Sequence, residues 1–245
     1  MTERAPVPEW LMVRAAEQLR VLGQMARLRL IELLFEGLRS DDVVVCANAS
    51  ACIIPYQSAR LKKGQRLISN SGSASLGYDL PAAIGAAAGN GGKRVICLAG
   101  DGSLQFNIQE LQTIRHHNLP VKIVVLNNGG YLSMRQTQSN FFGQLVGAGP
   151  DSGVSFPDYV KIAQAYGIPA ACITGVDTMP QLWDLLDSRG PSVCEVMLDA
   201  KQEIEPRLKP RQMPDGTIVS PALEDMYPFL DPEELRSNLF IKPLQ

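Results

Sequence analysis

Residues 94–103, RVICLAGDGS, join an apolar run to a Gly-Asp-Gly-Ser turn, and residues 121–128, VKIVVLNN, join a second apolar run to two asparagines. Apolar runs of this length are typical of buried strands in a parallel sheet. If the two strands are neighbours, Asp101 and Asn128 lie side by side beyond their carboxyl ends, where open α/β sheets bind ligands. Carboxylate and carboxamide oxygens suit Mg²⁺, which completes its coordination with phosphate and water. The two motifs therefore predict a site for a metal-bridged diphosphate.

The rest of the chain alternates between predicted strands and helices, which is typical of an α/β fold with a doubly wound, mostly parallel sheet and helices on both faces. Further strands are expected over residues 42–47, 169–174 and 191–198. Helices are expected over residues 80–88, 108–117, 157–166 and 179–188. Residues 129–155 contain six glycines and little periodicity, so we expect a long loop of a kind that is usually functional or mobile.

Composition divides the chain into three predicted regions. Residues 1–40 carry apolar side chains at helical spacing between Glu9 and Leu38, which indicates an N-terminal helical arm. Residues 41–200 form the predicted diphosphate-binding and Mg²⁺-binding α/β domain. Residues 201–245 are rich in proline and keep some apolar side chains, so we expect a tail that docks on a surface.

Bulk properties exclude several classes of protein. The 245 residues are 45% hydrophobic and 20% charged, which is ordinary for a soluble globular protein. A net charge of −2 gives no long-range attraction for nucleic acid or anionic lipid. The five cysteines lack metal-ligand spacing, the first residues do not resemble a signal peptide, and no apolar run is long enough to cross a bilayer. We therefore expect a cytoplasmic protein that binds small molecules and neither nucleic acid nor membrane.

The metal motif stands within a wider pattern. Asp101 and Asn128 are 27 positions apart, and they are accompanied by GYDLPAAIG at residues 77–85 and IQEL at residues 108–111. This combination resembles the thiamine diphosphate enzymes, and above all the C-terminal, diphosphate-binding domain of the acetolactate synthase large subunit, from about Asp42 to the C-terminus. The resemblance implies thiamine diphosphate and Mg²⁺ as cofactors. It implies no FAD, because the flavin-carrying middle domain of acetolactate synthase has no counterpart in this sequence.

The resemblance also implies roles for individual residues. Asp101, the side-chain oxygen of Asn128 and the backbone carbonyl of Gly130 would bind Mg²⁺. Leu76 would support the bent cofactor from beneath. The residues expected to contact the cofactor are Gly100, Gly102, Ser103, Leu76, Asn48, Ser50 and Tyr131.

Simpler interpretations stand beside several of these roles. Asp101 and Gly102 could form a plain strand-to-helix turn in which Ser103 caps the helix. Leu76 could be an ordinary core residue, and Tyr131 could pack the loop. Residues 47–52 depart from the glycine-glutamine-histidine stretch of the family, so phosphate contacts there would fall to Ser50 or Asn48. Arg135 could meet a substrate carboxylate or be a surface residue.

One part of the family's chemistry has no counterpart in this sequence. The glutamate that polarises the pyrimidine ring belongs to an N-terminal domain that is missing here, so no catalytic residue is assigned within the chain. Glu110, on the helix after the metal motif, is expected to be structural. We expect a split enzyme, in which a separate pyrimidine-binding subunit completes the site in a hetero-oligomer of α2β2 composition.

The expected activity is decarboxylation of a 2-oxo acid such as pyruvate, followed by ligation of the acyl carbanion equivalent to an acceptor, as in a transferase of the acetolactate synthase type. One alternative is a lyase subunit that only decarboxylates its 2-oxo acid, similar to sulfopyruvate decarboxylase. Another is a non-catalytic assembly or regulatory subunit that has kept the fold. A nucleotide-binding Rossmann or flavodoxin-like protein is disfavoured, because no GxGxxG follows the first predicted strand.

Overall fold

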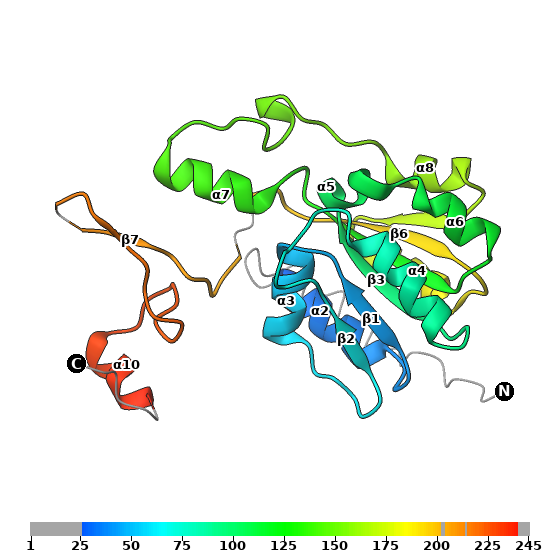
Figure 1. The fold of residues 1–245 in the computed structure, drawn as a ribbon, viewed down its shortest axis with the longest axis horizontal. Coiled ribbons are helices and arrows are strands. Elements are labelled where there is room, and N and C mark those ends of the chain that lie inside the picture. The colour runs from blue at the N-terminus through cyan, green and yellow to red at the C-terminus, as the bar shows by residue number, and fades with distance from the viewer. Residues whose placement is uncertain (1–25, 202–203, 214, 240–245) are drawn as a thin grey trace. The chain divides into compact units, whose positions relative to one another are not determined.

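The computed structural model describes residues 26–201, 204–213 and 215–239. The chain divides into two compact units, Met1–Gln202 and Glu203–Gln245, and each is described by itself. The first unit contains the predicted sheet (Figure 1). Within the ranges given above, no helix combines the length and the apolar character needed to cross a bilayer.

Six parallel strands form the sheet, in the order β2-β1-β3-β4-β6-β5. Their bounds are β1 Val43–Cys46, β2 Arg66–Ile68, β3 Val95–Gly100, β4 Val121–Asn127, β5 Ala170–Ile173 and β6 Ser192–Met197. The two apolar runs of the sequence are β3 and β4, and they are neighbours in a register that pairs Gly100 with Leu126. Strand β2 was not predicted, because three residues that are at most half-buried give no apolar run.

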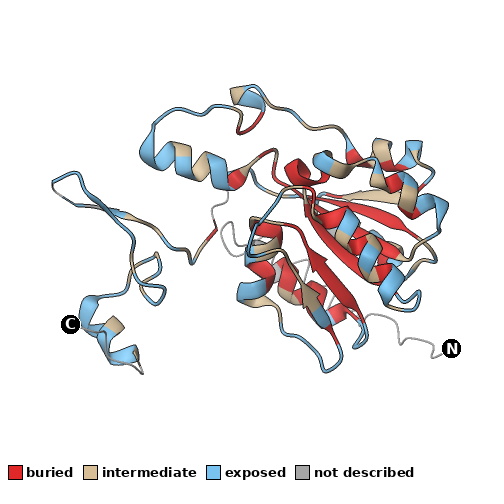
Figure 2. Ribbon diagram, viewed as in Figure 1, coloured by how far each residue is buried: buried red, intermediate tan, exposed pale blue. Residues whose placement is uncertain are grey.

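Different helices cover the two faces of the sheet. In β1, Val44 and Cys46 belong to one apolar cluster and Val43 and Val45 to the other, since successive side chains of a strand point to opposite faces. The helices on the first cluster are α2 (Ala26–Gly37), α3 (Ser50–Ser58) and α9 (Met179–Asp187). Those on the second are α4 (Asp79–Gly89), α6 (Glu110–His116) and α8 (Tyr159–Ala165). Figure 2 shows that burial is concentrated in the strands and in the helix faces that pack on them. The predicted α/β fold class is confirmed.

The carboxyl ends of β1 and β3 form a topological switch point. Strand β1 leads into α3, which packs on the first cluster, whereas β3 leads into the short helix α5 (Asp101–Leu104), which packs on the second. Because the chain leaves these neighbouring strands toward opposite faces, a crevice opens between them, and open α/β sheets bind their ligands in such a crevice. The polar residues that end the two predicted motifs, Asp101 and Asn128, lie at this carboxyl edge of the sheet.

The prediction that residues 129–155 form one long loop was wrong. The segment contains helix α7 (Leu132–Phe141) and a 3-10 turn at Pro150–Ser152. The sequence of α7, LSMRQTQSNF, is mostly polar, and Leu132 is its one fully buried residue. It therefore lacks the apolar stripe by which a helix is recognised from sequence.

The predicted N-terminal helix is described from Ala26 onward, and residues 1–25 lie outside the described ranges. Leu30, Leu34 and Phe35 of this helix are buried in the first apolar cluster. The described part of α2 is thus part of the core of the α/β unit, which differs from the separate arm expected over residues 1–40.

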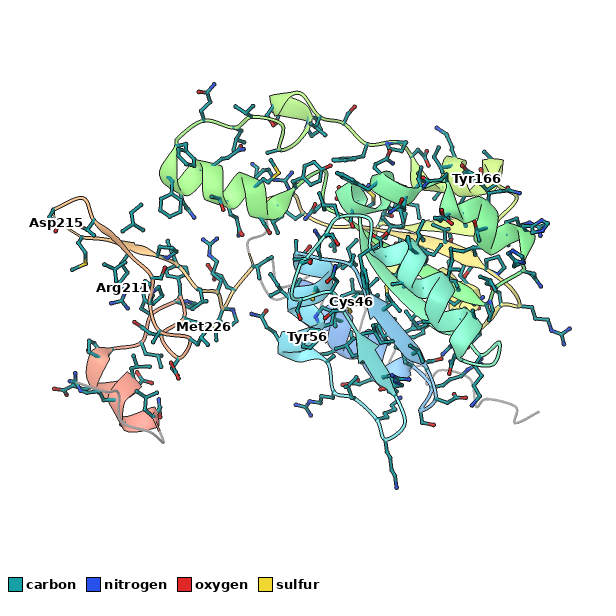
Figure 3. All side chains as sticks on the ribbon, in the orientation of Figure 1. Cys46, Tyr56, Tyr166, Arg211, Asp215 and Met226 are labelled. Carbon is teal, nitrogen blue, oxygen red and sulfur yellow. The ribbon has the colours of Figure 1, made fainter. Side chains whose placement is uncertain are left out.

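The second unit contains little regular structure. Its elements are β7 (Arg211–Gln212), β8 (Ile218–Val219) and α10 (Pro232–Asn238). Strands β7 and β8 pair as an antiparallel hairpin around a turn that includes Asp215, and Figure 3 labels Arg211 and Asp215 on this hairpin. Cation–π contacts support the unit, since the Nζ atom of Lys209 lies 4.1 Å from the ring centre of Tyr227. The docking of this tail stays a prediction.

Candidate functional site

A pocket of about 300 Å³ opens at the carboxyl ends of β1, β3 and β4. Residues 48–50, which come after β1 in the chain, form one wall of the pocket, and Figure 3 labels Cys46, the last residue of β1. All ten residues predicted to bind cofactor or metal line this pocket: Asn48, Ser50, Leu76, Gly100, Asp101, Gly102, Ser103, Asn128, Gly130 and Tyr131. The lining also includes residues that the sequence analysis missed: Ala49, Ala74, Leu126, Leu132, Ser133 and Met134. Three of these six lie on α7, which had been predicted as loop.

Asp101 connects the first motif to the turn that follows the second motif. The residue is 2% exposed, and its Oδ1 accepts the N–H of Gly102 at 2.8 Å while Oδ2 accepts the N–H of Gly130 at 2.7 Å. Burial raises the pKa of the Asp101 carboxyl, and the hydrogen bond from Gly130 opposes this rise. Each carboxylate oxygen can accept more than one hydrogen bond, so Asp101 keeps lone pairs for a further ligand.

Asn128 contributes a buried oxygen that has no partner. The residue is 3% exposed, and its Oδ1 makes no hydrogen bond within the described structure. A buried polar atom left unsatisfied destabilises a protein by roughly 1–3 kcal/mol, so it requires an explanation. A β-carbon added at Gly100 would meet no atom within 4 Å, so the space beside the end of β3 is open. A cation that prefers oxygen ligands would satisfy Asn128 in this space.

The donor set fits Mg²⁺ better than a transition metal. Among the described residues, no group of three or more His, Cys, Asp or Glu side chains is placed to hold a metal. Mg²⁺ needs only one or two carboxylates when phosphate and water supply its other oxygens, and Asp101 and Asn128 offer one carboxylate and one amide oxygen. Gly130 lines the same pocket, and the role of its carbonyl as a third ligand stays a prediction.

Arg135 holds the turn that follows β4. Its guanidinium donates to the carbonyls of Asn128 and Gly129, each at 2.9 Å, and to the carbonyl of Ala200 at 3.2 Å. Gly129 and Gly130 have φ angles of +68° and +141°, which residues with side chains rarely adopt. The arginine that the sequence analysis assigned either to a substrate carboxylate or to the surface therefore fixes the backbone of the site.

The ring of Tyr131 leaves no space for a side chain at position 102, so this position requires glycine. A β-carbon at this position would overlap the ring of Tyr131, which packs edge-on against Phe156 with 5.5 Å between ring centres. Burial raises the pKa of the Tyr131 hydroxyl. Tyr131 thus both lines the pocket and packs the segment after β4, as the two interpretations of its sequence position had allowed separately.

Ser103 does not cap the helix after the metal motif, so this simpler interpretation was wrong. Helix α5 begins at Asp101 with Gly100 as its N-cap, which places Ser103 inside it. The Ser103 hydroxyl accepts the N–H of Gly77 at 3.0 Å. Burial raises the pKa of Asp79, and a hydrogen bond from the Ser103 side chain opposes this rise. Because the hydroxyl is engaged with these neighbours, a phosphate contact at Ser103 would use its backbone N–H.

The residues before α3 and α4 line the pocket from the side of β1. Leu76 is half-buried and belongs to neither apolar cluster, so it is not an ordinary core residue. Asn48 donates from Nδ2 to the carbonyl of Ala74 at 3.2 Å, and Ser50 begins α3. Ala49 has a φ of +46°, a strained conformation that costs of order 1–3 kcal/mol and that is concentrated at functional sites. The roles of Leu76, Asn48 and Ser50 toward a cofactor stay predictions.

Tyr159 is a supporting residue that the sequence did not reveal. It is 1% exposed on α8, and its hydroxyl donates to the backbone carbonyl of Asp101. Gln105 in turn donates to the Tyr159 hydroxyl at 3.2 Å. Tyr159 lies 58 positions from Asp101 in the chain, so no local pattern links the two residues.

Comparison with known proteins assigns this geometry to a family. The family described as "Thiamine pyrophosphate enzyme, C-terminal TPP binding domain" matches residues 50–196, which include α3, strands β2 to β5 and all of β6 except its last residue, Met197. The chain belongs to this family. The resemblance to thiamine diphosphate (TPP) enzymes that the motifs predicted is thereby confirmed.

The relatives of this TPP-binding domain include acetolactate synthases. Acetolactate synthase isozyme 1 large subunit of Escherichia coli (strain K12) is 33% identical over 155 residues, which are 63% of this chain and 27% of that protein. Acetolactate synthase 2, chloroplastic, of Brassica napus is 35% identical over 182 residues, which are 72% of this chain and 29% of that protein. The chain therefore spans less than a third of the length of these relatives.

A solved TPP enzyme has the same fold. Rhodococcus jostii RHA1 thiamine diphosphate-dependent 4-hydroxybenzoylformate decarboxylase superposes with a TM-score of 0.65 at 25% sequence identity. The match covers 75% of this chain and 34% of that chain. Fold and family thus agree with the pocket in pointing to TPP.

Proposed function

We propose that this chain is the diphosphate-binding part of a TPP-dependent enzyme that decarboxylates a 2-oxo acid, pyruvate by analogy with the acetolactate synthases, and ligates the resulting acyl unit to an acceptor. The observation that carries the proposal is the unpaired Oδ1 of Asn128, which shares a pocket at the strand ends with the carboxylate of Asp101. The names of the relatives support 2-oxo acid chemistry.

The residues of this chain would bind and orient the cofactor. When bound, TPP supplies the carbanion that attacks a carbonyl carbon and the cationic ring that accepts electrons on decarboxylation. Asp101 and Asn128 would hold Mg²⁺ against the diphosphate, and Gly100 leaves room for it. Leu76 would support the cofactor through its half-buried side chain. Because Asp101 and Asn128 are buried, their electrostatic contacts with a bound Mg²⁺ would be stronger than at an exposed site.

We further propose that a pyrimidine-binding domain of a partner subunit supplies the activating glutamate. None of the described residues that line the pocket is a glutamate. Apolar side chains are exposed on and after α7, where Phe142 is 73%, Val146 63% and Met134 41% exposed. Exposed apolar surface beside a pocket is typical of an interaction site. A hetero-oligomer of α2β2 composition would cover this surface and complete the site.

Titration calorimetry of TPP into the full chain, with and without saturating Mg²⁺, tests the cofactor assignment. Binding should require Mg²⁺, and Asp101→Ala should weaken it by roughly 100-fold or more, because the one carboxylate ligand is lost. Asp151→Ala provides the matched control, since Asp151 is an exposed aspartate outside the pocket. Unchanged affinity of Asp101→Ala would refute the metal site.

A reconstitution experiment tests the reaction and the partner. The chain alone should not turn over pyruvate, whereas addition of the pyrimidine-domain subunit should give activity. Product analysis with and without a second 2-oxo acid as acceptor separates ligation from simple decarboxylation. The decarboxylase named among the solved structures favours that second activity as the alternative. Failure of the complex to bind TPP would instead support a non-catalytic assembly or regulatory subunit.

A further inference from the structure

We propose that Glu195 is a positioning residue for the metal-binding turn after β4 and that it acts through Asn127. Glu195 lies on β6, 68 positions from Asn127, and no motif in the sequence marks it. The inference rests on the proposed function, because it concerns how the chain presents Asn128 to the metal.

A short relay of hydrogen bonds connects Glu195 to this turn. The residue is 5% exposed, and its Oε1 accepts the Nδ2–H of Asn127 at 2.6 Å. The Oδ1 of Asn127 then accepts the N–H of Gly129 at 2.9 Å. Asn128, whose own Oδ1 has no partner, lies between the two residues that the relay fixes.

The relay also determines how the Asn127 amide is oriented. A carboxylate can only accept hydrogen bonds, so Glu195 selects the NH₂ end of the amide and turns the oxygen end toward Gly129. With an apolar residue at position 195, nothing on this side would prevent the amide from rotating. The N–H of Gly129 would then lose its acceptor, and the turn would lose one of its constraints.

The position of Glu195 is costly for a residue with a purely structural role. Its pairing with Val125 places it on the sheet face that carries the second apolar cluster, to which Val125 and Val193 belong. Burial of a carboxylate among apolar side chains is unfavourable, and apolar pairs of similar volume are often as stable as buried polar ones. A need to fix the direction of a backbone turn explains why a carboxylate occupies this position.

Glu195 and Arg135 constrain different backbone groups of the turn, an N–H group and two carbonyl groups. Arg135 binds the carbonyls of Asn128 and Gly129, whereas Glu195 acts through Asn127 on the N–H of Gly129. With both constraints in place, the backbone that carries Asn128 has a fixed direction, although the Asn128 oxygen has no hydrogen bond of its own.

The test measures the Mg²⁺ concentration that gives half-maximal TPP binding to the full chain, by calorimetry, together with the thermal unfolding midpoint. Glu195→Leu should raise the required Mg²⁺ concentration by roughly 10–100-fold, the usual effect of losing a residue that orients a metal ligand. Glu195→Gln should stay within about 3-fold of the native chain, because its Oε1 can accept the same hydrogen bond.

Ser192→Ala is the matched control on the same strand. Ser192 is 2% exposed, and its hydroxyl donates to the carbonyl of Leu185 at 2.9 Å, near the opposite end of β6. This variant also loses a buried hydrogen bond, so it should lower the unfolding midpoint and leave the Mg²⁺ requirement unchanged. A shift in its Mg²⁺ requirement equal to that of Glu195→Leu would show a general loss of stability and would overturn the proposal.

Four further results would decide whether Glu195 positions the turn. An unchanged Mg²⁺ requirement in folded Glu195→Leu, or an equal loss in Glu195→Gln, would overturn the positioning role. If Glu195→Leu does not fold, the double variant Asn127→Leu/Glu195→Leu replaces the polar pair by an apolar one; it should show the raised requirement, and a native value would overturn the proposal. If the native chain binds no TPP with Mg²⁺, the proposed function itself fails, and this inference fails with it.

Discussion

Polar side chains are buried at both ends of the same sheet, but the two ends differ in whether these side chains have hydrogen-bond partners in the protein. At the amino-terminal edge, Arg94 donates from Nε and Nη2 to the two oxygens of Asp42, at 2.7 and 2.5 Å, and from Nη1 to the carbonyl of Leu186 at 2.8 Å. Lys122 donates to the carbonyl and the hydroxyl of Ser188 at 2.7 and 2.8 Å. At the carboxyl edge, Asn128 keeps a buried oxygen without a partner.

Cavity volume does not distinguish these two ends. The amino-terminal edge has a cavity of about 390 Å³, larger than the pocket of about 300 Å³ at the carboxyl edge. The difference lies in how the polar groups are satisfied. Where protein atoms satisfy them, as at Arg94 and Asp42, the groups hold the fold together. Where a buried oxygen has no hydrogen-bond partner and lies beside strained, glycine-rich backbone, as at Asn128, the polar groups are available to bind a ligand.

Arg94→Ala should produce the largest effect and should confine it to stability. The substitution leaves the Asp42 carboxylate buried without its guanidinium, which lowers the free energy of unfolding by about 3–5 kcal/mol. Urea denaturation measures this loss, and calorimetry should find native Mg²⁺-dependent TPP affinity in the folded protein. Asp41→Ala, which removes an exposed ion pair with Lys93 at 3.5 Å, should change stability by about 1 kcal/mol or less. A comparable loss of TPP affinity in Arg94→Ala would contradict the separation of the two ends.

Asn128→Ala should show the opposite pattern. TPP affinity at limiting Mg²⁺ should fall by roughly 10–100-fold, because an oxygen ligand is removed. The free energy of unfolding should stay constant or rise by up to about 1 kcal/mol, because an unsatisfied buried oxygen is removed as well. Calorimetry and urea denaturation of the same preparation provide both values. A large loss of stability with unchanged affinity would mean that Asn128 has a structural role like that of Arg94.

Gly102→Ala tests the packing inside the pocket. The new methyl group would overlap the Tyr131 ring, and such overpacking costs about 1–3 kcal/mol of stability. In the background of Tyr131→Ala the same substitution should cost much less, because the ring is gone. A thermal-denaturation cycle over the four chains measures this coupling. Equal costs in both backgrounds would show that another contact requires the glycine.

Lys122→Met should have the smallest effect, and its distinctive sign is a changed dependence of stability on pH. Burial lowers the pKa of Lys122 to about 8, and repulsion by Arg94 contributes to the shift. The unfolded chain, in which lysine has a pKa of about 10.4, therefore binds more protons than the folded chain between pH 8 and pH 10. The stability of the native chain relative to Lys122→Met should thus rise with pH across this window. If urea denaturation gives a stability difference between the two chains that does not change with pH, the pKa of Lys122 is not lowered.

The sequence was sufficient to predict most of the sheet because most of its strands are buried on both faces. The runs that became β3 and β4 are apolar apart from Lys122, so their length and their bounding turns identified them. Strand β2 and helix α7 were missed because they bury too few side chains to leave a periodic pattern. Local pattern therefore predicted most of the buried elements. It also missed helix α3, which packs on the first apolar cluster.

The same distinction holds for the site. Asp101 and Asn128 could be placed together from sequence, because residues that follow adjacent parallel strands must meet at one edge. The contacts that hold them could not be predicted, since Arg135, Tyr159 and Glu195 act on backbone groups or through other side chains. Tyr159 and Glu195 lie 58 and 68 positions from the residues they bind, and such contacts depend on the packed structure.

The hydrogen bond from Gly130 to Asp101 joins the two loops of the pocket through protein atoms alone. A binding pocket that is already ordered loses little conformational entropy when its ligand binds, so more of the interaction free energy contributes to affinity. Exchange of one TPP molecule for another would then leave the shape of this corner unchanged. The rate of reloading would depend on diffusion and on opening of the proposed partner subunit, and the domain itself would not need to refold.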